Sequence, residues 1–414
     1  MRRFLKDLLV FLIPVIIVMC VVWTMGIYSG EAIHPRIIAQ LQANSCDYIY
    51  GKSHLASRVA YRMAQLDYTQ AEVFIVGSSR SVHFRDQFLD DPDKFFNISL
   101  PGTKTESVAS FVEQIIKRSS NVKVILVEVE PTIFNSRIAS DVALRLEDYM
   151  DLYDPMESEN VVKYLSENSN YLVQQLILRD LSLETIFLKE PNSKIQNNLD
   201  GVIPLGIEAI YSRTGFRCDG SIMESPIIIQ EATSDRELAL QHIEANVGLI
   251  QTGDTIEPMR FTYIEQLLQR VQQEQIQIIG YTMPYEPQIH EIMVTTGDYS
   301  FIDIAIQGIE ALFDEYGFPY ANLSDPTMIG AESEMFYDAE HPSELATLLS
   351  YIELLDRYPE ILGDYSDIDR LRSVANNVQD PFRVFPPFST YLQDEITTQS
   401  KPLAESEDSE KAKS

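Results

Sequence analysis

The sequence is poor in several residue types, and each shortage narrows the range of functions. Of 414 residues only 32 are lysine or arginine, against 62 aspartate or glutamate, so the net charge is −30. Phosphate binding needs a basic surface, and this composition therefore argues against a nucleic-acid partner. The few cysteines and histidines form no cluster with metal-ligand spacing, so we expect no metal site, and we expect no cofactor.

Cysteine is so scarce that the chain can form at most one internal disulfide. The three cysteines are Cys20, Cys46 and Cys218. Cys20 falls within a long apolar run, whereas Cys46 and Cys218 could form a disulfide outside the cytoplasm. Nothing in their spacing requires the bond, and both states stay open at this point.

Charge is absent from one long stretch near the N-terminus. Leu8 to Tyr28 carries no ionisable acid or base and exceeds the ~20 residues that a helix needs to span a bilayer. Arg2, Arg3 and Lys6 precede it, so the positive-inside rule places the N-terminus in the cytoplasm and the main domain outside. We expect a single-pass anchor in the cell membrane, with a cleaved signal peptide as the alternative.

The rest of the chain alternates between apolar runs and segments of helical periodicity. The apolar runs predict strands at Val73–Val76, Phe95–Ile98, Lys123–Val129, Ile276–Tyr281 and Tyr320–Leu323. Apolar residues three and four apart predict helices over 108–116, 264–271, 301–313 and 345–355. This alternation, with short loops, predicts an α/β fold built on a doubly wound parallel sheet.

The pattern breaks in the middle of the chain, where prolines and acidic segments alternate with short helical pieces. So long an interruption predicts a largely helical insertion or cap, either a lid or an interface. In it, Gly215 to Ile222 predicts a turn. The expected divisions are a cytoplasmic stub and anchor (1–29), a connector (30–70), a first core segment (71–135), the insertion (136–257), a second core segment (258–360), and a C-terminal extension with a disordered acidic tail (361–414).

A serine-containing turn follows the first predicted strand. Gly77 permits a sharp turn before Ser78 and Ser79, and the expected helix after it would point backbone N–H groups at a ligand. Because the turn is Gly-Ser-Ser rather than Gly-x-Ser-x-Gly, it is not the nucleophile elbow of α/β-hydrolases. His83, on the expected helix, would point away from the Ser79 hydroxyl.

A second motif, Asp-x-x-His, lies near the far end of the core. Asp338 and His341 are three residues apart, so their side chains can hydrogen-bond within one turn. A strand-end serine followed by Asp-x-x-His resembles the SGNH/GDSL hydrolase superfamily. The resemblance implies an SGNH-like three-layer sandwich in which Ser79 is the nucleophile, His341 the general base and Asp338 its orienting group. In the alternative interpretation, His341 only caps the last core helix.

The resemblance also implies donors for a reaction oxyanion. These are the backbone N–H of Ser79, Gly102 after the second strand, and an asparagine after the third. Here the chain departs from the family, because no Gly-x-Asn-Asp follows the third strand, and Asn135 is the nearest asparagine. Arg80, directly after the serine, could contact an anionic substrate group or pair with Glu128 or Glu130 near the strand end.

Within the superfamily, an N-terminal anchor with Gly-Ser-Ser resembles the branch of DltD-like and alginate O-acetylation-like proteins. That branch implies a membrane-anchored serine O-acyltransferase or esterase acting on a cell-surface polysaccharide or teichoic-acid-like glycopolymer. It also implies a membrane acyl-carrier or O-acyltransferase partner. The departure after the third strand leaves an alternative, a catalytically silent envelope scaffold or glycan-binding subunit.

Overall fold

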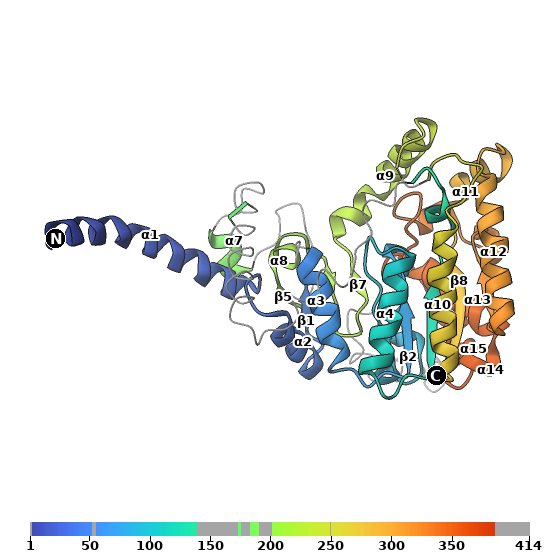
Figure 1. Ribbon diagram of the computed structural model, residues 1–414, viewed down its shortest axis with the longest axis horizontal. Helices are drawn as coiled ribbons and strands as arrows, with labels where there is room; N and C mark the ends of the chain where they lie inside the picture. Colours follow the sequence, from blue (N-terminus) through green and yellow to red (C-terminus); the bar gives the residue numbers. More distant parts are fainter. Residues whose placement is uncertain are drawn as a thin grey trace, which may run out of the picture.

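A five-stranded parallel sheet forms the centre of the main domain, which confirms the α/β class (Figure 1). The computed structural model describes residues 2–51, 55–138, 173–174, 183–189, 201–248 and 250–385. Much of the predicted insertion and the predicted acidic tail lie outside these residues. The sheet order is β3-β2-β4-β8-β9, with β2 at Val73–Val76, β3 at Phe95–Asn97, β4 at Val124–Glu128, β8 at Gln277–Thr282 and β9 at Tyr320–Asn322.

Helices cover both faces of this sheet. One face is covered by α4 (Thr105–Arg118), α10 (Met259–Gln273) and α12 (Ser300–Tyr316), and the other by α13 (Glu344–Arg357) and α15 (Ile368–Asn377). Successive strand residues point to opposite faces: Phe74 and Val76 join the first core, whereas Val73 and Ile75 join the second. A strand buried on both faces has no polar position, which explains the uninterrupted apolar runs.

The strand order creates a switch point between β2 and β4. After β2 the chain crosses to β3 on one side, and after β4 it continues to β8 on the other side. Ligands of open α/β sheets bind outside the carboxyl ends of the strands at such a point, because the connections diverge there and leave a crevice. The sequence Gly77-Ser78-Ser79 follows β2 directly at this position.

The N-terminal helix α1 (Arg2–Ser29) projects away from the rest of the molecule (Figure 1). Among the described residues, Val10–Ser29 is the one helical stretch long and apolar enough to cross a membrane. The side chains of Val10 to Met19 are exposed, so no described element covers them. At its end, α1 packs on α7 (Leu183–Leu188) through Met25 and Ile186.

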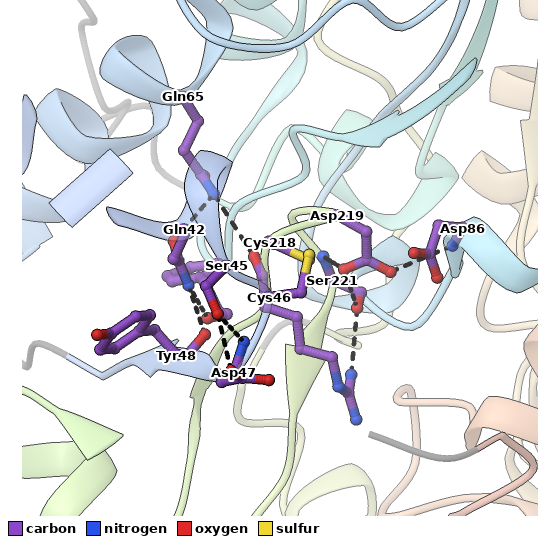
Figure 2. The surroundings of a disulfide bond; sticks show 12 residues. Gln42, Ser45, Cys46, Asp47, Tyr48, Gln65, Asp86, Cys218, Asp219 and Ser221 are labelled. Carbon is purple, nitrogen blue, oxygen red and sulfur yellow. Dashed lines mark hydrogen bonds between the residues drawn. A yellow bond between two sulfur atoms is a disulfide. The ribbon is translucent and has the colours of Figure 1, made fainter. Parts of the chain in front are cut away.

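A smaller four-stranded sheet joins the connector to the described portion of the insertion, and the sequence did not predict it. Its order is β5-β1-β6-β7, with β5 at Ile203–Leu205, β1 at Tyr48–Tyr50, β6 at Gly215–Phe216 and β7 at Ile222–Met223. A disulfide between Cys46 and Cys218 ties the start of β1 to the β6–β7 hairpin (Figure 2). The remaining α-helices are α2 (Pro35–Asn44), α3 (Leu55–Leu66), α8 (Ile207–Ser212), α9 (Pro226–Glu244), α11 (Pro287–Thr295) and α14 (Pro359–Leu362).

The helix expected after Ser79 is wrong. The segment instead forms two short 3-10 turns, Ser79–Ser81 and Asp86–Phe88. The buried side chain of Asn97 donates hydrogen bonds to the carbonyls of Ser81 (2.8 Å) and Phe84 (3.1 Å). Those carbonyls are therefore hydrogen-bonded by a residue of the neighbouring strand. Serine and other short polar residues in this segment also favour turns over a helix.

Candidate active site

Ser79 lies at the carboxyl end of β2, on a turn fixed by one buried carboxylate. Glu128, at the end of β4, accepts hydrogen bonds from the Ser78 amide (2.7 Å), the Ser78 hydroxyl (2.9 Å) and the Ser81 hydroxyl (2.6 Å). A Cβ at Gly77 would lie 2.4 Å from the Glu128 carboxylate, so only glycine allows this approach. The turn is thus held rigidly on both sides of Ser79.

The structure brings Ser79, His341 and Asp338 together in one hydrogen-bonded chain. His341 Nε2 lies 2.7 Å from Ser79 Oγ, and His341 Nδ1 lies 2.8 Å from Asp338 Oδ2. A carboxylate at Nδ1 fixes the proton there, which leaves Nε2 to accept the serine proton. The side chains of His341 and Asp338 are each 34% exposed, so the chain is open to a substrate.

The loop that carries Asp338 and His341 is closed by its own hydrogen bonds. Asp338 Oδ1 accepts from the amides of Glu340 and His341, each at 2.9 Å. The Tyr337 amide donates to the His341 carbonyl (2.9 Å), and α13 begins directly after Ser343. His341 therefore stands in a tight turn before the last core helix, and its imidazole faces the serine instead of capping that helix.

The charges around this loop shift both pKa values. Burial lowers the pKa of His341, but the hydrogen bond and charge of Asp338, with Glu340 nearby, outweigh it and raise that pKa to about 9. Burial raises the pKa of Asp338, but His341 and two backbone amides outweigh it and lower that pKa to about 2. At neutral pH the pair is therefore mostly an imidazolium and a carboxylate, and only the minor neutral form of His341 can accept the serine proton.

Arg80 does not face the site. Its side chain is 2% exposed and pairs with Glu130. It also donates to the carbonyls of Met283 (2.7 Å), Pro284 (2.8 Å) and Glu340 (3.0 Å). The guanidinium thus links the serine turn to the β8 end and to the histidine loop, and the expected contact with an anionic substrate is replaced by this ion-paired role.

Of the two expected oxyanion donors outside Ser79, only Gly102 lies open. Gly102 has φ of +83°, and a Cβ there would meet nothing within 4 Å. Its loop is held against the serine turn, because the Leu100 amide and the Thr103 hydroxyl both donate to the Gly77 carbonyl, at 3.2 and 2.7 Å. The glycine thus borders the site.

The side chain of Asn135, expected as an oxyanion donor, makes hydrogen bonds to other groups in the structure. The side chain is fully buried, and its amide nitrogen donates to the carbonyls of Gln251 (2.9 Å) and Thr252 (3.3 Å). Its amide oxygen accepts from the Arg137 backbone at 3.0 Å. Asn135 therefore fastens the 251–253 loop to the end of β4, and its donors are committed there.

His83 is buried, and the centroid of its ring lies 5.3 Å from that of Tyr337. Burial, with Arg217 and His341 nearby, lowers its pKa to about 3. It is therefore a neutral packing residue, and it lies in a turn rather than on the expected helix.

Sequence reasoning missed a chain of charges that joins the disulfide hairpin to the start of α13, directly after the histidine loop. Asp219, next to Cys218, accepts from the Asp86 amide (3.1 Å) and from Arg85 (3.3 Å). Arg85 also pairs with Glu344 at 2.6 Å, the first residue of α13. The sequence signal was Asp219 directly after a cysteine in a predicted turn, but its partners come from distant segments.

No cluster of three or more His, Cys, Asp or Glu side chains that could hold a metal occurs within the described ranges. The described geometry places a serine, a histidine and an aspartate in one hydrogen-bonded chain, held by the buried carboxylate of Glu128 and the ion-paired Arg80.

A comparison with curated proteins found no match. The profile of a protein family described as "Protein of unknown function (DUF1574)" matches residues 5–358, which cover most of α1, both sheets and α13. The match spans well over half of the chain, and on that basis the chain belongs to the DUF1574 family.

Proposed function

We propose that this protein is a serine O-acyltransferase or esterase of SGNH-like fold that acts on a cell-surface glycopolymer. The observation that carries the proposal is the hydrogen-bonded chain from Ser79 Oγ through His341 to Asp338. Two observations support it. Ser79 lies at the β2–β4 switch point, and the side chains of His341 and Asp338 are partly exposed to solvent.

In the proposed reaction, Ser79 Oγ attacks the carbonyl carbon of an acyl ester while His341 Nε2 takes the hydroxyl proton. The ester C–O bond breaks, and His341 gives that proton to the leaving alkoxide. An acceptor hydroxyl, or water, then attacks the acyl-Ser79 carbonyl, and its proton passes through His341 back to Ser79. Asp338 stabilises the imidazolium in each step.

The oxyanion would rest on backbone donors of Ser79 and the Gly102 loop. Since the Asn135 amide is engaged elsewhere, it does not supply the third donor of the resembled family. Loss of one donor costs about 10²–10³ in rate in a measured hydrolase. A slow enzyme with a dedicated acyl donor fits this arrangement, and a membrane acyl-carrier or O-acyltransferase partner would supply the acyl group.

The proposed location is the outer face of the cell membrane. The exposed apolar helix α1 supports an anchor, and the basic residues before it support a cytoplasmic N-terminus. The Cys46–Cys218 disulfide supports an oxidising compartment for the main domain, because cytosolic thiols are kept reduced.

Labelling with an alkyl fluorophosphonate tests the proposal on the full chain reconstituted in nanodiscs. We expect wild type to be labelled, with the label located on Ser79 by peptide mass spectrometry, and Ser79→Ala and His341→Ala to show none. Ser234→Ala, which alters an exposed serine of α9, is the matched control and should label like wild type. Folded wild type without label would favour the alternative, a catalytically silent scaffold or glycan-binding subunit.

A further inference from the structure

The end of α1 is joined directly to the smaller sheet. The amide of Gly206, which follows β5, donates to the carbonyl of Ser29 at 2.6 Å. The amide of Ile207, at the start of α8, donates to the buried carboxylate of Glu31 at 2.8 Å. Because these hydrogen bonds connect α1 to a folded sheet, the depth of α1 in a membrane also sets the height of the elements around its end.

Helix α7 packs beside this end of α1 (Figure 1). Ile186 and Met25 are buried in one apolar cluster. The ring centroids of Phe187 and Tyr28 lie 5.2 Å apart. The amine of Lys189, which follows α7, lies 5.6 Å from the centroid of the Tyr28 ring. Helix α7 is thus attached to the last two turns of α1 through aliphatic, aromatic and cation–π contacts.

The length of the apolar run gives the level of these contacts in a bilayer that α1 spans. The last charged residues before the run are Lys6 and Asp7, so the hydrocarbon core would begin near Leu8. A helix rises 1.5 Å per residue, and the ~30 Å core is therefore crossed by about 20 residues, which ends the crossing near Tyr28. Since α7 packs at this level, it lies at the boundary between the lipid tails and the headgroups.

Exposed apolar side chains occur on both helices at this boundary. On α7, Phe187 is 40% exposed and Leu188 is 59% exposed, and on α1 both Ile27 and Tyr28 are exposed. Exposed apolar patches are typical of surfaces that contact a protein or a membrane, and aromatic residues are enriched at the membrane boundary. The patch on α7 continues from a helix that is itself apolar and exposed, which favours lipid as its partner.

We propose that α7 lies in the outer headgroup region of the bilayer and inserts Phe187 and Leu188 toward the lipid tails. The proposal rests on the proposed anchoring of α1 and is independent of the chemistry of Ser79. It assigns this described part of the predicted insertion to an interface, one of the two roles expected for it. With α1 and α7 both in contact with lipid, the main domain is held at two points and has one preferred orientation on the membrane.

The test uses depth-dependent fluorescence quenching, because the sequence contains a single tryptophan, Trp23 on α1. In a Trp23→Phe background of the full chain, Phe187→Trp places one reporter on α7. Val294→Trp, at an exposed position of α11, is the matched control. The proteins are placed at one copy per nanodisc in phosphatidylcholine brominated either near the headgroup end or near the methyl end of its acyl chains. We expect Phe187→Trp to lose most of its emission with the shallow bromines and less with the deep ones, and Val294→Trp to keep its emission in both lipids.

Equal emission of Phe187→Trp in brominated and unbrominated lipid overturns the proposal. A blue-shifted emission without quenching also overturns it, because another protein surface would then cover α7. If Phe187→Trp fails to fold, Leu188→Trp, at the more exposed position, is measured in the same way. Wild-type Trp23 separates the two levels of the argument: quenched Trp23 with unquenched Phe187→Trp rejects the α7 contact alone, whereas unquenched Trp23 rejects the anchoring on which it rests.

Discussion

The charge balance around His341 makes the pH dependence of Ser79 reactivity the sharpest test of the site. A general base must be neutral to accept the serine proton, and the pKa of His341 is raised from 6.5 to about 9. At pH 7 about 1% of the imidazole would then be neutral. We expect the fluorophosphonate labelling rate to rise about tenfold per pH unit from pH 6 and to level off near pH 9.

Glu340→Gln is the informative perturbation, because it removes a negative charge that raises the His341 pKa while leaving Asp338 in place. One nearby charge shifts a pKa by about 1 unit. The rising limb should therefore move to lower pH by that amount, so labelling at pH 7 increases about tenfold while the rate at high pH stays the same. Glu334→Gln, at an exposed position on the same loop, is the matched control and should leave the profile unchanged.

Two outcomes would refute this reasoning. A labelling rate that is flat between pH 6 and 9 would mean that His341 is already neutral. A pH profile that is the same in Glu340→Gln and wild type would mean that the Glu340 charge does not affect the pKa of His341. Salt provides a third readout. Since a third of each side chain is exposed, added salt should screen the Asp338–His341 pair and lower the apparent pKa.

Three further predictions concern groups that support the site. Replacing Cys46 and Cys218 by serine opens a cross-link between residues 172 positions apart, so thermal unfolding should show a loss of up to about 5 kcal/mol, and an unchanged melting temperature would contradict this. Glu128→Gln should slow Ser79 labelling at least about tenfold, because a neutral amide cannot accept all of the turn's hydrogen bonds; wild-type labelling would show that the turn needs no carboxylate. Asn135→Ala should cost about 1–3 kcal/mol of stability in chemical denaturation and spare labelling of the folded protein, whereas a hundredfold slower reaction would restore its oxyanion role.

The elements that the sequence predicted are those whose signal is local. The strand Val73–Val76 has the same bounds in the prediction and the structure, because a strand buried on both faces shows as an apolar run that ends where the chain leaves the sheet. Asp338 and His341 could be paired for the same reason, since residues three apart in a turn lie side by side. Ser79 could be singled out because it comes directly after such a strand.

The elements that the sequence missed depend on partners far along the chain. Strand β6 is only two residues long, which is too short for a recognisable alternation of apolar and polar residues. Strand β1 pairs with β5, which lies far along the chain, so no local pattern reveals the pairing. The turns after Ser79 replace a helix because Asn97, on the neighbouring strand, holds two carbonyls that a helix would have used. The Cys46–Cys218 bond is likewise a property of the folded sheet, since it ties β1 to a hairpin that the sequence showed only as a turn.

Arg80 shows how such long-range contacts alter the interpretation of a site. From the sequence, an arginine beside a reactive serine suggests a substrate contact. In the structure its guanidinium is buried against Glu130 and three carbonyls, one of which belongs to Glu340 on the histidine loop. A buried arginine that lost these partners would leave unpaired polar groups at several places at once. Arg80 therefore couples the position of Ser79 to that of His341.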